Sequence, residues 1–507
     1  MGDFMKLDTA VFAFLVGVSM CVASMAHAAS ASQEWAIAHN SPINSNEEFN
    51  VVIEAPDGSV YAAGTTYLAG QGDNLLLTKY DADGDLLWER AMDSGSNGLD
   101  QPQRIALDSA GNVVLAGASW RVGGIHLVVW KFEPAAGDLL WERSDLAAGE
   151  NLTWDFIKAG LAIGTDDSVY ASGASLVVAR YAADGTQMWK VAPGTIAAMQ
   201  GTDVVVDAEG NAYIASIGSS SGGGFGIRAL DPDGVLMWEK WSIGHFGSVL
   251  GAAWVDLDPS GNVIMAGVPE TTCGLFGLMI WKYDATGQLQ WTTTYRDMPC
   301  DSFDAVGMAV DCAGDVFVAG TTAGVNYDIV TAKFDGASGD FLWDRTHDGP
   351  AGTTDGAYAM TLDAQGNVYT VGEEMFTSPQ NRDIVTISYD SAGNTRWIKS
   401  YGGTAGANDR GLGVAVGRCG RVYSAGYGWN PPQNNDGFLI AYSQYASGDL
   451  DFDGDVDLGD FAIMQVHYGM TGTFQDGDLN GDGAVSIDDY AVMAAQFSPP
   501  CEYLDSE

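Results

Sequence analysis

Short apolar runs separated by Gly and Asp turns follow one another along almost the whole chain. One phrase occurs eight times, and its clearest copy reads Asp311-Cys-Ala-Gly-Asp-Val-Phe-Val-Ala-Gly320. Runs of this length and alternation, bounded by turn residues, are typical of β-strands rather than helices. A repeat at intervals of about 50 residues predicts a repeat architecture rather than several unrelated domains.

Tryptophans mark the same period out of phase with that phrase. They stand at Trp35, Trp88, Trp141, Trp189, Trp238, Trp291, Trp343 and Trp397. Each interval holds four predicted strands, and four strands per radially repeated unit are typical of a propeller blade. The sequence therefore predicts an all-β, eight-bladed β-propeller over residues 32–446, with seven blades left open as the alternative count. The repeated tryptophans are expected to pack between neighbouring blades.

The two ends of the repeat region complement each other. The chain enters with an apolar strand around Trp35 that has no blade before it, and the last repeat stops after Gly437–Tyr442 without a tryptophan strand. We expect the N-terminal strand to complete the last blade. Closing a ring in this way removes the exposed edge strands that an open array would carry.

The net charge and the first 28 residues bear on the partners and the cellular location of the protein. The chain has 22 Lys and Arg against 66 Asp and Glu, a formal net charge of −44. This balance argues against binding nucleic acid, which needs clustered cations, and against docking to anionic lipid. Residues 1–28 combine Lys6, an apolar run and Ala26-His27-Ala28, which predicts a secretory signal peptide. We expect a secreted or cell-surface protein without membrane insertion.

Candidate chemistry within the predicted blades is sparse. Five aspartates precede predicted innermost strands at similar distances: Asp100, Asp155, Asp304, Asp355 and Asp409. Arranged around the propeller axis, they would ring one mouth of the channel and hold a cation or polar ligand. The alternative is that each accepts backbone N–H bonds in its own turn.

Tryptophans outside the blade rhythm are candidates for stacking on a sugar ring, because amphipathic aromatic side chains favour half-wet binding sites. They are Trp120, Trp154, Trp254 and Trp429. The alternative is that they cover the edge of the core. Five cysteines follow the predicted signal peptide, and their disulfide connectivity stays open.

The C-terminal segment carries a duplicated pattern of oxygen ligands. The candidate ligand residues are Asp449, Asp451, Asp453, Asp455, Asp457 and Asp460 in the first copy, and Asp478, Asn480, Asp482, Ala484, Ser486 and Asp489 in the second. Their spacing fits a 12-residue calcium loop, in which position 7 contributes its backbone carbonyl. An amphipathic helix is predicted after each loop, with Phe461, Met464 and Tyr468 matching Tyr490, Met493 and Phe497. We expect two calcium ions; the alternative is a solvated acidic tail.

These motifs resemble known families. Residues 32–446 resemble secreted bacterial β-propeller repeat proteins through the phrases Asp-x-x-Gly-Asn-Val-Tyr-Val-Ala-Gly and Lys-Tyr-Asp-x-x-Gly-x-x-x-Trp. This resemblance implies a fold and no activity. The second phrase is also similar to quinoprotein dehydrogenases, which have eight blades and usually carry adjacent cysteines. The sequence has no adjacent cysteines.

Residues 447–500 resemble a type I dockerin, because a calcium loop and its following helix occur twice with Asp at position 12; residues 501–507 form a tail. The resemblance implies calcium-dependent binding of a cohesin-type protein. The residues at the loop positions that contact the partner in that family are here Leu458, Gly459, Ile487 and Asp488. Dockerins often accompany enzymes of polysaccharide catabolism.

The sequence thus predicts a secreted calcium-binding protein, in which a propeller binding or assembly module carries an EF-hand-type, dockerin-like domain. The alternative is an extracellular carbohydrate-active enzyme, a glycoside hydrolase or polysaccharide lyase, with its site at the propeller mouth. A facing pair of carboxylates whose pKa values are pushed apart would favour the enzyme. No catalytic residue is identified, and a quinoprotein ranks third.

Overall fold

The computed structural model describes most of the repeat region and two segments near the C-terminus. The described residues are 31–40, 45–68, 70–93, 98–121, 124–146, 159–173, 177–191, 199–218, 224–243, 253–268, 277–295, 302–323, 326–377, 380–403, 407–417, 420–430, 434–444, 458–471 and 484–494. The predicted signal peptide, Asp155, Trp154, Phe497 and most of both predicted calcium loops lie outside these residues.

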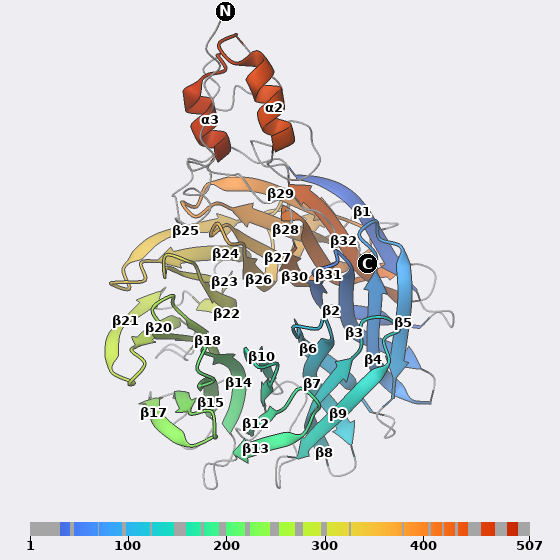
Figure 1. Cartoon of the computed structure of the whole chain (residues 1–507). Coiled ribbons are helices and arrows are strands. Elements are labelled where there is room, and N and C mark those ends of the chain that lie inside the picture. Colours follow the sequence, from blue (N-terminus) through green and yellow to red (C-terminus); the bar gives the residue numbers. More distant parts are fainter. Residues whose placement is uncertain are drawn as a thin grey trace, which may run out of the picture.

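Eight four-stranded antiparallel sheets stand around a common axis, so the predicted count of eight blades is confirmed (Figure 1). Blades 1 and 2 are β2 (Glu47–Glu54), β3 (Val60–Leu68), β4 (Gly72–Tyr80) and β5 (Leu86–Met92), then β6 (Asp100–Leu107), β7 (Val113–Arg121), β8 (Gly124–Phe132) and β9 (Leu139–Leu146). Blades 3 and 4 are β10 (Gly160–Ile163), β11 (Val169–Ser172), β12 (Val178–Tyr181) and β13 (Gln187–Val191), then β14 (Met199–Val206), β15 (Ala212–Gly218), β16 (Gly224–Leu230) and β17 (Leu236–Ile243).

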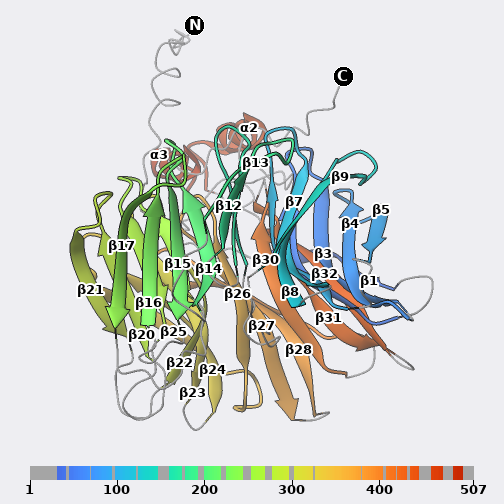
Figure 2. The ribbon, with the colours of Figure 1, turned by 90° about the horizontal axis from the view of Figure 1, so that it is seen from below.

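The other half of the ring repeats this order. Blades 5 and 6 are β18 (Ala253–Leu257), β19 (Val263–Gly267), β20 (Leu278–Tyr283) and β21 (Leu289–Tyr295), then β22 (Ser302–Val310), β23 (Val316–Ala323), β24 (Tyr327–Phe334) and β25 (Phe341–His347). Blade 7 is β26 (Gly356–Leu362), β27 (Val368–Thr377), β28 (Gln380–Tyr389) and β29 (Thr395–Tyr401). Blade 8 joins β30 (Asp409–Val416), β31 (Val422–Asn430) and β32 (Asn434–Gln444) to β1 (Ala31–His39). In the side view the strands run between the two faces of the ring (Figure 2).

The ring closes as the sequence predicts. Strand β1 pairs antiparallel with β32, and Trp35 lies opposite Ala441. The hydroxyls of Ser32 and Ser443 are 2.8 Å apart at one end of this pair. On the inner side, β2 contacts both β6 and β30, so the first and last innermost strands are neighbours. The blade that contains both ends of the repeat region is therefore complete.

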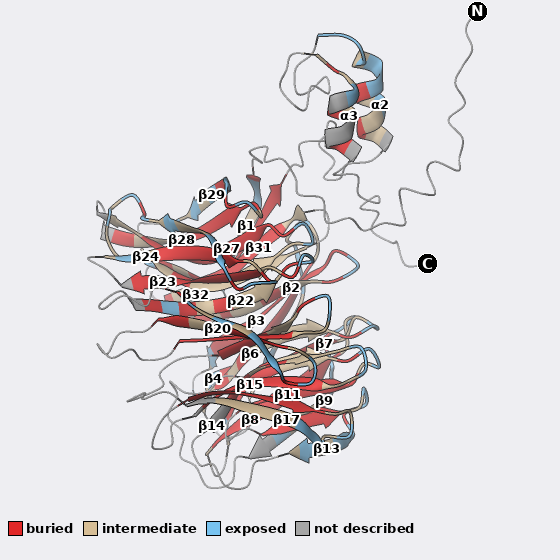
Figure 3. Ribbon diagram, turned by 90° about the vertical axis from the view of Figure 1, so that its left-hand side faces the viewer, coloured by how far each residue is buried: buried red, intermediate tan, exposed pale blue. Residues whose placement is uncertain are grey.

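The hydrophobic core lies between blades rather than in one central cluster (Figure 3). Between blades 1 and 2, for example, Leu77 of β4 packs with Leu115 of β7 and Trp130 of β8. Both faces of a blade meet a neighbour, so the second and third strands are buried on both sides. This explains why their sequences are continuous apolar runs instead of alternating ones.

The repeated tryptophans join each blade to the next, as predicted. The indole N–H groups donate to turn carbonyls of the following blade: Trp35 to Ala82, Trp88 to Pro134, Trp141 to Ala183, Trp189 to Pro232, Trp238 to Ala285, Trp291 to Gly336 and Trp343 to Ser391. The eighth, Trp397, donates to Gln444 Oε1 at 2.9 Å. The turns beneath them need glycine: Gly137 has φ 72°, and a Cβ there would lie 2.6 Å from the Trp88 ring. Only glycine tolerates both constraints cheaply.

A buried ion pair reinforces this joint in several blades. In blade 2, Lys131 Nζ lies 2.6 Å from Asp108 Oδ2, and both side chains are almost fully buried. Lys131 also donates to Ala183 O at 3.0 Å, the same carbonyl that accepts the Trp141 indole. Buried pairs at the same place link Lys282 to Asp258 and Lys333 to Asp311. Lys79 with Asp57 and Arg180 with Asp166 repeat the pairing, but there the acid is exposed. An acid in the turn after the first strand of a blade therefore pairs with a basic residue on the third strand of the same blade.

Two short helices follow the ring in sequence: α2 (Leu458–His467) and α3 (Ile487–Ala494). Met464, Val485 and Met493 form their buried core, and the rings of Phe461 and Tyr490 meet edge-on at 5.6 Å. The predicted apolar faces do pack together, except that Tyr468 is 52% exposed. Among the described residues, no helix combines the length and apolar character that a membrane crossing requires.

Candidate functional site

A shared β-bulge sets the register at one end of the innermost strands. The bulge occurs in β2, β6, β14, β22, β26 and β30. In four of these blades, the residue three positions before the bulged residue is a buried acid. These acids are Glu47, Asp100, Asp355 and Asp409. Blade 6 has Phe303 at this position, so the predicted Asp304 is one residue out of register and exposed. Sequence reasoning missed Glu47, because only the bulge reveals the equivalence.

These carboxylates bond within their own blade corners. Asp409 Oδ2 accepts the Gly403 N–H at 2.6 Å. Asp355 accepts the N–H groups of Gly349 at 2.5 Å and Met375 at 2.8 Å. The Ser119 hydroxyl donates to Asp100 at 2.5 Å. Asp355 and Asp409 thus accept local backbone N–H bonds, as the alternative interpretation has it, and Asp100 accepts from a neighbouring hydroxyl.

Burial also shifts the pKa values of aspartates in these blade corners. It raises the pKa of Asp355, and it raises the pKa of Asp409 to about 7, with a smaller contribution from the charge of Asp383. Burial likewise raises the pKa of Asp383 itself, and the charge of Glu374 adds to the shift. Desolvation disfavours the ionised form of a carboxyl group, which is the physical cause in each case.

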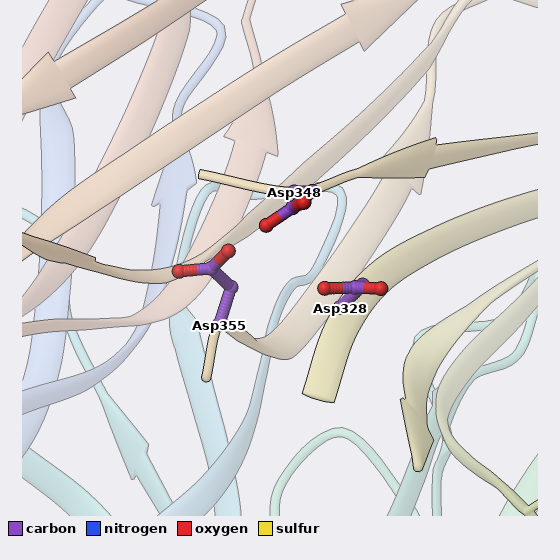
Figure 4. A group of neighbouring side chains, drawn as sticks. All are labelled: Asp328, Asp348 and Asp355. Carbon is purple, nitrogen blue, oxygen red and sulfur yellow. The ribbon is translucent and has the colours of Figure 1, made fainter. Parts of the chain in front are cut away.

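One predicted aspartate does join a cluster that could hold a hard cation. Asp355 lies with Asp328 and Asp348, and one oxygen from each is within 4.8 Å of the others (Figure 4). Asp328 lies on β24, Asp348 follows β25, and Asp355 precedes β26, so the group joins blades 6 and 7. With one oxygen from each residue, the three carboxylates supply three ligand atoms, fewer than the six to eight that calcium prefers. Sequence reasoning missed Asp328 and Asp348 because only the fold brings these segments together.

A second cluster joins blades 7 and 8 around Glu373, which is 4% exposed. Its carboxylate accepts Arg382 Nη1 at 2.7 Å, Arg410 Nε at 2.8 Å and the Tyr358 hydroxyl at 3.1 Å. The Arg410 guanidinium lies over the Tyr358 ring at 4.9 Å and near the Tyr427 ring at 6.0 Å. Burial alone would lower the pKa of Arg410, but the bond to Glu373 reverses this and raises it.

The tryptophans outside the blade rhythm divide into two groups. Trp254 is 7% exposed and belongs to the core between blades 5 and 6, as the alternative interpretation has it. Trp120 and Trp429 lie near the ends of β7 and β31 and are 39% and 43% exposed. Both side chains are exposed to solvent on one side.

Four of the twelve candidate calcium ligands lie among the described residues: Asp460, Ala484, Ser486 and Asp489. Asp460 and Asp489, at position 12 of the two loops, lie in the first turns of α2 and α3 and are fully buried. Asp489 Oδ2 accepts the Ser486 N–H at 2.7 Å, which caps the start of α3. Ala484 immediately precedes Val485 of the helix core. Asp449, Asp451, Asp453, Asp455, Asp457, Asp478, Asn480 and Asp482 lie outside the described residues.

The predicted partner-contacting residues occupy equivalent places in the two copies. Leu458 and Gly459 open α2, and Ile487 and Asp488 open α3. Ile487 is 61% exposed. This arrangement presents the start of α3 to solvent.

Comparisons with known proteins support the propeller. A family model described as outer membrane protein assembly factor BamB matches residues 173–423. The chain is similar in structure to a quinohemoprotein alcohol dehydrogenase from Comamonas testosteroni, with TM-score 0.52 and 12% identity over 81% of this chain and 76% of that one. It is also similar to the quinohemoprotein alcohol dehydrogenase ADHIIG from Pseudomonas putida HK5, with TM-score 0.50 and 12% identity over 81% and 76% of the two chains.

A third similar structure is the C-terminal WD40 domain of Sif2, with TM-score 0.50 and 14% identity over 80% of this chain and 99% of that one. No curated protein is significantly similar in sequence. At these identities the structural likeness concerns the fold alone. The matched repeats and the closed ring are those of a β-propeller.

Proposed function

We propose that this chain is an exported binding protein whose propeller carries a calcium-dependent docking module over residues 447–500. The observation that carries the proposal is the duplication of the C-terminal segment. Asp460 and Asp489 are both fully buried in the first turns of their helices, and Met464 and Met493 are both buried between those helices. The helices that follow the two copies of the ligand pattern thus pack against each other, which supports a paired calcium module.

Metal binding and folding should be coupled in this module. Its described core is small, consisting of Met464, Val485 and Met493 with partly buried Phe461, Ile463 and Tyr490 around them. Segments of this size usually need a metal, disulfides or a partner to fold. The predicted loops also bring many carboxylates together, and two bound calcium ions would neutralise their repulsion.

Export is supported by two independent features. The first 28 residues have the pattern of a secretory signal peptide. Cys312, in the turn between β22 and β23, is disulfide-bonded to a partner outside the described residues. Structural disulfides persist in oxidising compartments outside the cytosol. The work of the protein is therefore proposed to take place outside the cell or at its surface.

The partner of the docking module is proposed to be a cohesin-type protein. The resemblance to type I dockerins supports this class, and residues Leu458, Gly459, Ile487 and Asp488 are the proposed contacts. Their side chains differ from the Ser-Thr pair that is frequent in that family, so the cohesin bound here should differ in specificity as well.

A calcium-dependent pull-down tests the proposal. Immobilised full-length protein is mixed with secreted and envelope proteins of the source organism, in calcium and then in excess chelator. We expect a cohesin-type protein to be captured only in calcium. The matched variant is Asp460→Ala with Asp489→Ala, which should lose capture while the ring stays folded. Capture that persists in chelator, or calorimetry showing no calcium uptake by the folded protein, would contradict the proposal.

An enzymatic role receives no comparable support. Acid–base catalysis on a glycosidic bond needs two carboxyl groups whose pKa values are moved apart. Asp383 and Asp409 interact electrostatically, and burial raises both pKa values. We propose binding rather than catalysis as the function of the propeller.

A further inference from the structure

Three exposed aromatic side chains lie at equivalent positions in three consecutive blades. Trp429 lies near the end of β31 in blade 8, Tyr67 near the end of β3 in blade 1, and Trp120 near the end of β7 in blade 2. Their exposed fractions are 43%, 45% and 39%. We call these three residues the aromatic arc. Large aromatic side chains usually bury their surface, so three at one repeated position point to a ligand.

The backbone holds the arc in a fixed arrangement. The backbone N–H of each arc residue donates to the carbonyl just before the innermost strand of its blade. The pairs are Tyr67 with Asn46, Trp120 with Leu99, and Trp429 with Asn408. Trp120 also lies on Gly98, where an added Cβ would stand 2.4 Å from the Trp120 Cβ. A ligand that binds such preorganised rings loses little free energy to ordering the protein.

The arc continues into the polar cluster around Glu373. Trp429 and Tyr427 are two residues apart on β31, so their side chains lie on the same side of the sheet. Tyr427 interacts electrostatically with Arg410, Glu48 and Glu373. Glu48 in turn interacts with Asp73, the cross-strand partner of Tyr67. Aromatic and charged side chains therefore lie near one another over blades 7, 8 and 1.

Charge selects among the ligands that such a surface would accept. Arg382 and Arg410 are the cations, and both already bond to Glu373. Glu48 and Asp73 add two further acidic groups, and the pKa of each is raised, chiefly by burial. The surface thus has no surplus of positive charge, and the whole chain has a formal net charge of −44. A polyanion would be repelled.

We propose that the aromatic arc and the cluster around Glu373 bind an uncharged oligosaccharide, whose sugar rings stack on Trp429, Tyr67 and Trp120. The hydroxyl groups of the sugars would bond to Arg382, Arg410, Glu48 and Asp73, which offer both donors and acceptors. Packed sheets lie about 10 Å apart, so the aromatic residues of three consecutive blades span more than one sugar ring. The ligand is therefore a chain of sugars. This inference deepens the binding role proposed above for the propeller and rests on it.

Affinity electrophoresis of the full chain tests the inference. Native gels contain a neutral polymer, either a β-glucan, a xylan or a galactomannan, or the acidic polymer polygalacturonate. We expect at least one neutral polymer to retard the protein and polygalacturonate to leave its migration unchanged. Trp429→Ala should weaken the binding about tenfold, the upper end of a single aromatic contact. Tyr67→Ala, in the next blade, should act in the same direction.

The matched control is Tyr327→Ala, because Tyr327 is an exposed tyrosine, 51% accessible, at the start of β24 outside the arc. It should bind like the unmodified protein. Every gel is run in calcium and in chelator, and we expect the same retardation in both, so a failure of the docking module leaves this result untouched. Retardation by polygalacturonate alone, by none of the neutral polymers, or equally for Trp429→Ala would overturn the inference. So would a Trp429→Ala variant that loses a protein partner but keeps glycan binding.

Discussion

The ring and the C-terminal helices are stabilised by different means. Each blade buries apolar side chains against two neighbours, and the indole of each repeated tryptophan bonds to the next blade. Among the described residues, the segment of the two helices fully buries Met464, Val485 and Met493, together with the acids Asp460 and Asp489. The ring thus has extensive hydrophobic burial beside its buried acids and ion pairs, whereas the helices bury two acids within a small apolar core. Stability of the ring should depend on closure, and stability of the helices on a cation.

The largest effect is expected from removing the closing strand. Deletion of residues 31–39 leaves β32 as an open edge and removes the ion pair of Arg421 with Glu34 at 2.9 Å. An unpaired edge strand promotes aggregation, so we expect loss of the soluble monomer and of the cooperative thermal transition. Size-exclusion chromatography and a thermal melt measure this. Deletion of residues 1–28 alone is the control and should leave both unchanged; a stable monomer without β1 would refute the role of closure.

Removal of calcium should unfold the helices and spare the ring. We expect hydrogen exchange of the α2 and α3 amides to become fast in chelator, while the amides of β31 and β32 stay protected. The reason is that buried Asp460 and Asp489 lose the charge that balances them. Asp489→Ala should weaken calcium binding by at least about tenfold, which isothermal calorimetry measures. Equal exchange with and without calcium would remove the contrast between the two regions.

A buried ion pair within the ring should matter less than closure but still clearly. Lys131→Met leaves Asp108 buried without its cation, which costs about 3–5 kcal/mol. Urea unfolding measures the loss. Adding Asp108→Asn should recover part of it, because the unpaired charge disappears. The control is Arg90→Met, whose pair with Asp138 is exposed; its loss should cost only about 0–1 kcal/mol. Equal costs for both pairs would contradict the expected effect of burial.

The smallest effect is a pH dependence of the ring. Burial raises the pKa of Asp409 to about 7, so its ionisation in the folded state costs free energy that the unfolded chain does not pay. Stability should therefore fall as the pH rises from about 4, the usual pKa of an aspartate, to about 7 and then level off. Asp409→Asn keeps an acceptor for the Gly403 N–H, and its advantage in melting temperature over the unmodified protein should grow over this pH range and be largest at about pH 8. The exposed Asp304→Asn is the control. Parallel pH profiles for Asp409→Asn and the unmodified protein would show that Asp409 does not titrate in this range.

The sequence predicted the repeated features of the ring and missed the unrepeated ones. Trp35 without a blade before it predicted closure, because its missing partner strand had to lie at the other end. The bulge of the innermost strands left no periodic signal, so Glu47 was missed and Asp304 was placed in the wrong register. Sequence periodicity reports which face a side chain occupies, and a bulge changes that face without changing the pattern.

The clusters at the blade junctions were missed for a different reason. Glu373, Arg382 and Arg410 come from three strands of two blades and meet only when blades 7 and 8 pack together. Asp328 and Asp348 likewise join Asp355 across a blade boundary. Each residue alone resembles an ordinary surface charge. Tyr468 shows the opposite error, since helical spacing predicted it on the packed face and the short helix pair leaves it exposed.

Closure by the N-terminal strand also sets an order of events in synthesis. Ser32 and Ser443, which bond to each other, are 411 residues apart. The strand that leaves the ribosome first is therefore the last to find its partner. Loop-closure entropy grows only with the logarithm of that separation, so the delay arises from waiting for the rest of the chain rather than from the cost of pairing. Until β32 has been synthesised, β1 lacks its partner strand. A chaperone that shields β1 would therefore act between the synthesis of β1 and the synthesis of β32.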